Sequence, residues 1–462
     1  MKRVIPLLIG MFFVLTACQG PPKDMDAALD SGRGFLHYGG MGEVCATEDT
    51  VYFTSGELIH YYDKASGTSG VLCGKPECEH STASGSGCNA YIGSSSDSLC
   101  VYNNRLYWVS GYPEAICSMA LDGTDHRTGR QLENDVYSAH YGSSSAIFHR
   151  GCAYVWVINY AVRDGKEVAR LDLAAVPLDP DREVHMIFRE ELPDMAASNS
   201  SYVTMQAYGD VLYILTNWAA NSHEGDPGVY DFQIRRYHAE TQELTTLYHD
   251  SKSPIDYTVE MWVMDGGVVF LGHDGHSGRL FKFDFETSGI TRLFTPTGAV
   301  AVAEDLVVSH RYTYQKSNPT NPWGLTLAVQ DIEVDGELDV IIYDFIGEVL
   351  LNGTYRLDGR FNSPEFYGID ETYAYFLGST NFGGTTYMSL IGAALDGSGG
   401  AEVLCTEEEF YDLGGGHSTT AITQDDGTTV TVDGDIITVI PGDGGETVIM
   451  TVEELIEKGY QP

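Results

Sequence analysis

The stretch Gly209-Asp210-Val211-Leu212-Tyr213-Ile214-Leu215-Thr216 decides the fold, because the same pattern recurs along the 462-residue chain. A polar turn leads into a short strand that carries an aromatic residue among aliphatic ones. The other copies span residues 48–53, 104–109, 151–156, 266–271, 304–308 and 371–376. Repetition of one short strand at this spacing indicates a repeat architecture rather than a series of unrelated domains.

Each copy belongs to a larger unit. A further strand follows and ends in a turn rich in Asp, Thr and Gly, as at residues 61–67, 119–124, 236–241, 283–289 and 394–399. Those residue types supply the local hydrogen bonds and positive φ angles of tight hairpins. A last short strand closes several units, at 70–72, 244–247, 290–293 and 401–404. Four short antiparallel strands in every ~50 residues predict an all-β fold, a β-propeller.

The number of blades is seven or eight. Seven units are clear, and residues 428–450 contain a weaker eighth unit at the expected spacing. Residues 34–38 could add its outermost strand and close the ring, and residues 451–456 have the capping residue and carboxylates of a short terminal helix. We therefore predict one propeller domain over residues 34–462.

The first residues predict export. Lys2 and Arg3 precede an apolar run that is too short for a comfortable membrane span, and Leu15-Thr16-Ala17-Cys18 ends it. This ending resembles the lipobox of bacterial lipoproteins, which implies removal of residues 1–17 and acylation of Cys18. An ordinary signal peptide with an incidental cysteine is the alternative. Residues 18–33 would be a flexible tether, and the acyl chains would hold the protein on the membrane.

The charge limits the partners. Without Lys2 and Arg3, 24 basic residues face 66 acidic residues, a net charge of −42. Such a chain repels the phosphates of nucleic acid, so we expect no nucleic-acid partner. It repels anionic lipid as well, so attachment to a membrane requires the covalent lipid. Because the acidic residues are scattered, a solvated surface explains them better than one acidic binding patch.

The repeat and one cysteine motif resemble known families. The Leu-Asp-Gly strand ends at residues 121–123 and 395–397 resemble those of YWTD-type and TolB-like propellers, although the YWTD tetrapeptide is absent. Together with the lipobox, the segment at residues 72–80 and Cys88-Asn89-Ala90 resembles a group of uncharacterised Gram-positive surface lipoproteins. The resemblance implies the fold and a place on the outer face of the cytoplasmic membrane, and it transfers no activity.

Four potential metal ligands are close in the sequence: Cys73, Cys78, His80 and Cys88. Three thiols and an imidazole can form a tetrahedral zinc site. Outside the cytoplasm, one or two disulfides that close a Gly/Ser-rich loop are an alternative, and unpaired thiols are a third. All three interpretations give the segment a structural role. Cys100, Cys117 and Cys152 fall in strand patterns and are expected to be buried.

One face of the propeller should collect the long connections. In a propeller, the connections between the second and third strands of all blades share a face with the connections to the next blade. Here they carry aromatic residues and histidines that suit a binding site. The candidates are Tyr112, Tyr160, Trp218, His273, His276, Tyr312, Tyr314, Trp323 and Phe382. His273 and His276 beside Asp274 could also bind a metal, but a solvated turn explains them as well.

The sequence favours a non-enzymatic function. A rigid ring with long connections suits recognition of an envelope protein or a glycan. A glycan-active enzyme with acid and base residues on the same face is the first alternative, and an assembly or scaffold factor for envelope proteins is the second. Common nucleophile, zinc-protease and phosphate-loop motifs do not occur in the sequence. We therefore assign no catalytic residue.

Overall fold

The computed structural model describes residues 44–451 with gaps. The gaps are residues 56, 81–86, 93–97, 111–114, 133–145, 164–165, 193–201, 220–229, 256, 265, 274–277, 297, 304–305, 315–335, 345, 358–361, 370–371, 383–384, 397–399, 410–419, 424–427, 434–435, 442–444 and 446. The described residues form strands and turns and contain no helix, so the all-β prediction is confirmed.

Thirty-two strands make eight four-stranded antiparallel sheets in chain order among the described residues. The first four blades comprise β1 (Val44–Ala46), β2 (Thr50–Ser55), β3 (Leu58–Asp63), β4 (Thr68–Val71); β5 (Cys100–Tyr102), β6 (Arg105–Ser110), β7 (Ala115–Ala120), β8 (Arg127–Gln131); β9 (Ala146–His149), β10 (Cys152–Arg163), β11 (Lys166–Pro177), β12 (His185–Glu191); β13 (Tyr202–Tyr208), β14 (Val211–Ala219), β15 (Tyr230–His238) and β16 (Glu243–Ser253).

The remaining strands have the same arrangement. They are β17 (Tyr257–Met264), β18 (Gly267–His273), β19 (Gly278–Asp284), β20 (Ile290–Arg292); β21 (Ala299–Ala303), β22 (Leu306–Tyr314), β23 (Gly336–Asp344), β24 (Val349–Leu357); β25 (Asn362–Ile369), β26 (Tyr373–Phe382), β27 (Thr385–Ala394), β28 (Ala401–Glu409); β29 (Thr420–Thr423), β30 (Thr429–Asp433), β31 (Ile436–Ile440) and β32 (Val448–Thr451). We call the four strands of a blade a to d, and the side on which strands b and c connect the b–c face.

The repeated phrase is strand b of each blade, as predicted. In blades 2 and 3 its polar turn is a two-residue hairpin between strands a and b. Asn103 and Asn104 both have positive φ angles, of 48° and 60°, and Arg150 and Gly151 have 48° and 75°. A two-residue turn with positive φ at both positions matches the twist of the flanking strands, and Asn and Gly adopt it most easily. The turn residues therefore set the register of the innermost hairpin.

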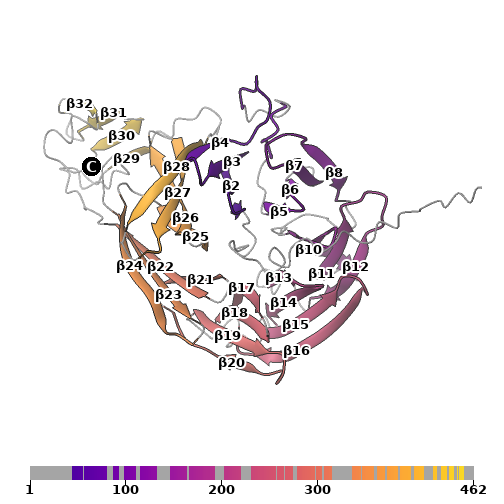
Figure 1. Ribbon diagram of the computed structural model, residues 1–462. Helices are drawn as coiled ribbons and strands as arrows, with labels where there is room; N and C mark the ends of the chain where they lie inside the picture. Colours follow the sequence, from indigo (N-terminus) through magenta and orange to yellow (C-terminus); the bar gives the residue numbers. More distant parts are fainter. Residues whose placement is uncertain are drawn as a thin grey trace, which may run out of the picture.

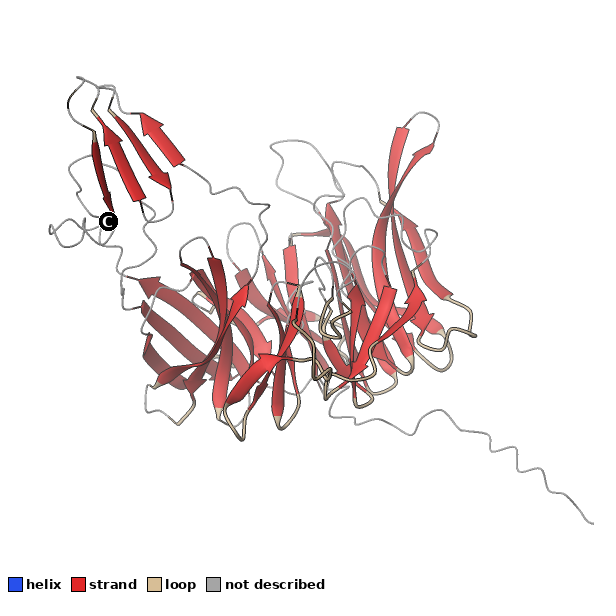
Figure 2. Ribbon diagram, turned by 90° about the horizontal axis from the view of Figure 1, so that it is seen from above, coloured by secondary structure: helices blue, strands red, loops and turns tan. Residues whose placement is uncertain are grey.

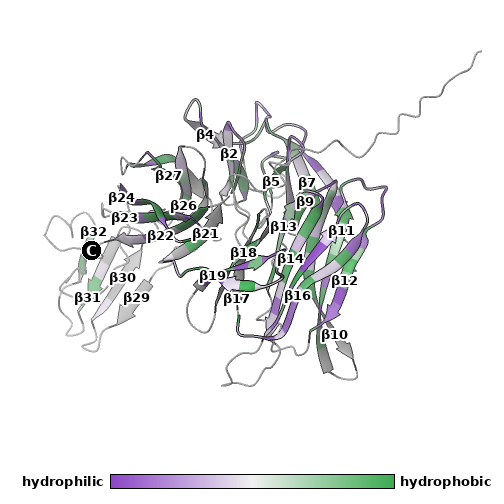
Figure 3. Cartoon of the chain, turned by 60° about the horizontal axis from the view of Figure 1, so that its bottom comes forward, coloured by the Kyte–Doolittle hydropathy of each residue, from purple (hydrophilic) through white to green (hydrophobic). Residues whose placement is uncertain are grey.

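Seven of the sheets surround one axis as a seven-bladed β-propeller (Figure 1). Adjacent blades pack through the apolar side chains of their middle strands. For example, Trp108 of blade 2 is fully buried in a cluster with Tyr52 and Ile59 of blade 1. Figure 3 shows hydrophobic segments on the middle strands and hydrophilic ones on outer strands such as β12 and β16. Burial between blades, rather than at one common centre, holds the ring together.

The ring closes between the first and last of these blades. Val44 and Phe53 of blade 1 share a buried cluster with Tyr375, Leu377 and Leu390 of blade 7. Strand β28 also contacts β2 and β4 directly. Because blade 1 packs directly against blade 7, the propeller has seven blades.

The weaker eighth unit forms a sheet, but the sheet is not a blade. Strands β29 to β32 pair in order, and Figures 1 and 2 draw them beside blade 7 and outside the ring. The strand expected at 34–38 lies outside the described residues. Of the helix expected at 451–456, residue 451 belongs to β32 and the rest lies outside the described residues. Within the described residues, no helix is long and apolar enough to cross a membrane.

A candidate metal centre and a candidate binding face

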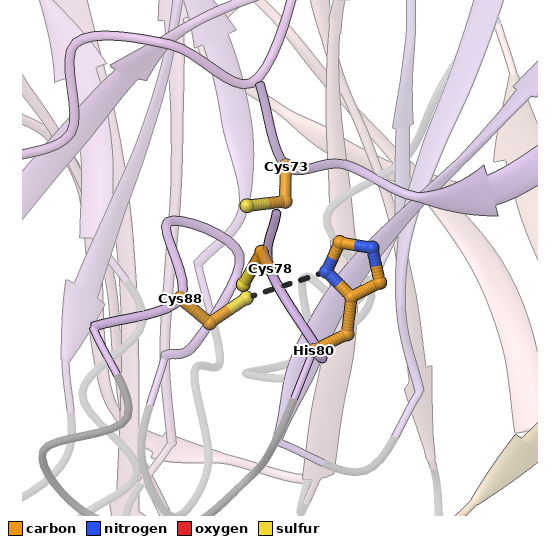
Figure 4. A group of neighbouring side chains, drawn as sticks. All are labelled: Cys73, Cys78, His80 and Cys88. Carbon is orange, nitrogen blue, oxygen red and sulfur yellow. Dashed lines mark hydrogen bonds between the residues drawn. The ribbon is translucent and has the colours of Figure 1, made fainter. Parts of the chain in front are cut away.

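The four predicted ligands come together in the connection between β4 and β5. Each offers one ligand atom, and the three Sγ atoms and the imidazole nitrogen all lie within 4.8 Å of one another. His80 Nδ1 is 3.8 Å from Cys88 Sγ, and Figure 4 shows the ring turned toward that sulfur. The residues Cys73, Cys78, His80 and Cys88 can therefore hold a metal ion together, as the spacing suggested.

Backbone groups surround two of the thiols. Burial raises the pKa of the Cys73 thiol, but hydrogen bonds from the backbone of Lys75 and Asn89 and contacts with the neighbouring thiols outweigh it, so the pKa is lowered overall. Burial raises the pKa of Cys88 to about 12, although the backbone of Ala90 opposes this. A cation between these sulfur atoms would stabilise their thiolate forms.

The segment is attached to two blades at once. In blade 1, Ile59 N–H donates to the Ala90 carbonyl at 2.9 Å, and Ile92 N–H donates to that of Glu57. In blade 2, the Gly123 carbonyl accepts from Gly74 N–H at 2.9 Å and from Asn89 Nδ2 at 2.8 Å. Gly123 belongs to the turn between strands c and d of blade 2. The cluster therefore lies at the junction of blades 1 and 2.

The other thiols lie apart from this cluster. Among the described residues, no disulfide joins any of the eight cysteines from Cys45 to Cys405. Cys100, Cys117 and Cys152 lie on β5, β7 and β10, and burial raises the pKa of each. Cys117 is buried, as expected, whereas Cys100 and Cys152 are only half-buried; all three have apolar neighbours. The lipidation candidate Cys18 lies outside the described residues.

Most of the predicted face residues are on strands rather than in loops. Tyr160 is on β10, Trp218 on β14, His273 on β18, Tyr312 and Tyr314 on β22, and Phe382 on β26. Trp218 is only 6% exposed and packs in the cluster between blades 3 and 4. Tyr312 is half-buried against the cluster of blades 5 to 7. Tyr112, His276 and Trp323 lie outside the described residues.

Several b–c hairpins are longer than the sequence analysis expected, so these residues lie on strands. Strands β10 and β11 have twelve residues each and pair continuously from Cys152↔Pro177 to Arg163↔Lys166. Strand β9 pairs with residues 152–155 and β12 with residues 170–175. Residues 159–163 and 166–169 therefore continue the hairpin past its blade, and Figure 2 shows it rising above the ring.

Three more hairpins lengthen in the same direction. Strands β14 and β15, β22 and β23, and β26 and β27 have nine to ten residues each, whereas β2, β3, β6 and β7 have six. The sequence analysis placed Tyr160 in a connection between strands, which was wrong, because residue 160 is on β10. The Asp164-Gly165 pair is a strong two-residue hairpin signal between alternating residues and could have identified the arm.

Comparison with known proteins gives no family. No protein-family model and no curated protein matches the chain. Similar solved structures include a prolyl endopeptidase, at 10% identity over 91% of this chain and 57% of that one with a TM-score of 0.47. They also include TolB from Acinetobacter baumannii, at 13% identity over 77% of this chain and 76% of that one, with a TM-score of 0.32. The nidogen/laminin complex matches at 12% identity over 66% of this chain and 92% of that one, again with a TM-score of 0.32.

These likenesses transfer no function. The chain spans 57%, 50% and 59% of three peptidase chains that it resembles. Identities near 10% leave no residue-by-residue correspondence from which a catalytic or binding role could be carried over.

Proposed function

We propose that this protein is a non-enzymatic binding protein of the cell envelope, held on the outer face of the cytoplasmic membrane by lipid on Cys18. Its b–c face would bind an envelope protein or glycan. The observation that supports this most is the arm, which we define as residues 159–163 of β10 and 166–169 of β11. In this proposal the Cys/His cluster supports the scaffold and does not contact the ligand.

The geometry of the arm suits recognition. Beyond the reach of β9 and β12, its two strands pair with each other, so each presents an outer edge. A strand edge can bind an extended partner through backbone hydrogen bonds, and the side chains above it can add selectivity. The three other lengthened hairpins stand around the same face. Rigid elements at the rim of a closed ring lose little conformational entropy when a partner binds.

The charges fit a binding function better than acid catalysis. A general acid requires a carboxyl group whose pKa is raised. Among the described residues, the carboxyl groups with a shifted pKa are Asp63, Asp122, Asp125 and Asp284, and all four are lowered. Hydrogen bonds from Ser66, Thr124, Arg127 and Thr287 are the largest causes, in that order. Asp63, Asp122 and Asp284 accept hydrogen bonds within tight turns, and Asp125 pairs with Arg105 and Arg127.

The binding proposal is tested by shortening the arm. Deleting residues 161–162 together with 167–168 removes two residues from each strand, so the alternation of side chains and the Asp164-Gly165 pair are kept. The arm becomes about 7 Å shorter. We expect the wild-type chain to recover a partner from native envelope extract, or to bind on a glycan array, and the shortened variant to bind at least about tenfold less.

The control lies at the other end of the same blade. Arg182 is exposed in the β11–β12 turn, and Arg182→Ala should leave binding unchanged. Equal binding by the wild-type and shortened chains would show that the arm is not the recognition element. Hydrolysis of a glycan bound on the array would replace the binding function with the enzymatic alternative.

Membrane attachment is tested separately. Cys18→Ala removes the acylated thiol, so the protein should move from the membrane fraction to the soluble fraction of the producing cell. Metabolic labelling with a fatty acid should mark the wild-type chain and not the variant. Unchanged partitioning of Cys18→Ala would contradict the lipid anchor without affecting the binding proposal.

A further inference from the structure

We propose that Cys73, Cys78, His80 and Cys88 form a closed tetrahedral zinc site that fixes the β4–β5 connection against blades 1 and 2. This inference does not depend on the proposed binding function, because it concerns the stability of the ring and not its ligand.

The distances suit one ion with four ligands. In a tetrahedral site, Zn–S bonds of about 2.3 Å place two sulfurs about 3.8 Å apart, and a sulfur and an imidazole nitrogen about 3.6 Å apart. Here the ligand atoms all lie within 4.8 Å of one another, and Cys88 Sγ is 3.8 Å from His80 Nδ1. The four side chains converge from three short pieces of chain around one point (Figure 4). A contraction of at most about 1 Å completes the site.

The local backbone supports the same arrangement. The Cys73 sulfur interacts with the backbone of Lys75, two residues on, and the Cys88 sulfur with that of Ala90, also two residues on. Amide N–H groups directed at ligand sulfurs orient them as a second shell around a metal. His80 has a φ angle of 52°, which is uncommon outside glycine, and this conformation directs its ring to the cluster.

The composition of the cluster favours an ion over a disulfide. Any one disulfide among three thiols leaves the third thiol and the imidazole without a role, whereas one ion uses all four groups. Zn²⁺ with three thiolates and a neutral imidazole has a net charge of −1. Lys75 supplies a nearby positive charge, and its Nζ donates to the Gly87 carbonyl in the same connection. Four protein ligands leave no open position, so the site is structural rather than catalytic.

The ion would act on the junction between two blades. The ligands flank Gly74 and Asn89, whose hydrogen bonds reach the Gly123 carbonyl of blade 2, and Ala90, which pairs with Ile59 of blade 1. Fixing Cys73 and Cys88 to one centre therefore fixes the hydrogen bonds to both blades. Removal of the ion should loosen this junction before the others.

The first experiment measures metal in the full-length protein purified without added metal or chelator. We expect about one zinc ion per chain by elemental analysis. Cys73→Ser, Cys88→Ser and His80→Ala should each lose most of it, while Cys152→Ser, which changes a thiol outside the cluster, should keep it. Replacement of the zinc by cobalt should give the thiolate-to-cobalt absorption band of a sulfur-rich tetrahedral site. A wild-type chain without zinc that takes up no cobalt would overturn the proposal.

A second variant separates the ion from a disulfide even if the serine variants fold poorly. Cys78→His replaces one zinc ligand with another and cannot form a disulfide at that position. We expect it to retain zinc, and we expect a chelator to lower the melting temperature of the wild-type chain. Intact mass after thiol alkylation under denaturing conditions should show Cys73, Cys78 and Cys88 all alkylated without prior reduction. An oxidised pair among these three in a zinc-free chain would contradict the proposal.

Discussion

At the scale of single residues, the aromatic side chains of the repeated phrase pack between blades. Tyr213 is 9% exposed and stacks on Phe285 of the next blade, with ring centroids 5.3 Å apart. Some buried tyrosine hydroxyl groups donate to a backbone carbonyl of the next blade. Tyr52 Oη donates to the Leu121 carbonyl of blade 2 at 3.3 Å. Burial of the ring and satisfaction of the hydroxyl explain why the repeat uses Tyr so often, without any contact with a ligand.

His310 gives a pH-dependent prediction. It lies on β22 beside the rings of Phe366 and Phe376, and burial lowers its pKa to about 4, although the backbone of Pro364 opposes this. The unfolded chain then binds more protons than the folded one below the ordinary pKa of about 6.5. The contribution of His310 to the free energy of unfolding should be constant above that pH. It should fall by about 3 kcal/mol as the pH is lowered to 4.

The measurement compares urea unfolding of the wild-type chain and His310→Gln at several pH values between 7 and 4. Glutamine keeps a hydrogen-bond donor but does not titrate, so the variant should lose less stability on acidification. Parallel pH profiles for the two chains would exclude His310 as the cause.

At the scale of elements, neighbouring blades contact each other through charged side chains as well as through apolar side chains. Arg235 on β15 of blade 4 is only 3% exposed at its side chain, and its guanidinium is 2.7 Å from Glu190 on β12 of blade 3. It also bonds Gln233 and lies over the Phe188 ring, 4.6 Å from its centroid. The sequence pattern of β15 predicted a strand, but it gave no sign that this particular arginine would be buried.

Removal of Arg235 should loosen the junction of blades 3 and 4. Arg235→Ala leaves a cavity over Phe188 and removes the partner of Glu190, so we expect the free energy of unfolding to fall by about 3 kcal/mol. Arg236→Ala, at the next and exposed position, should change it by less than about 0.5 kcal/mol. Chemical unfolding of the two variants provides the comparison, and equal losses would contradict a specific role for Arg235.

At the scale of the whole molecule, stability depends on closure of the ring between blades 1 and 7. Phe53 on β2 is fully buried in that closing cluster with Tyr375 and Leu377 of β26. Truncation of a buried Phe typically costs about 3–5 kcal/mol. We expect a loss of this size for Phe53→Ala in urea unfolding, compared with almost none for Ile346→Ala, whose side chain is 84% exposed. A negligible loss at Phe53 would show that the ring does not need this contact.

The sheet β29 to β32 should be dispensable for the ring. Strand β28 ends at Glu409, and blade 7 already closes on blade 1 through strands before that point. A chain that ends after residue 409 should therefore melt at nearly the same temperature as the full chain and show the same near-ultraviolet circular dichroism. Loss of cooperative unfolding in the shortened chain would instead support a single domain that includes the C-terminal residues.

The sequence by itself determined the strands, their order within each blade and the composition of the tight turns. Each of these depends on residues close in the chain, such as Asn103-Asn104 before strand β6, so a local pattern is sufficient. It also brought the four Cys/His ligands into one short segment. The extent of the β10–β11 arm was missed because Tyr160 was assigned to a loop.

Only the tertiary structure decided how many sheets the ring contains and which side chains meet. Residues 428–450 have the strand pattern of a blade, yet ring closure depends on whether Phe53 packs against Tyr375, more than 300 residues away. In the same way, the sequence spacing could not tell that the three thiols and the imidazole converge at a junction between blades. The physical reason is that strand formation depends on local alternation and turns, whereas closure and side-chain convergence depend on packing between distant parts of the chain.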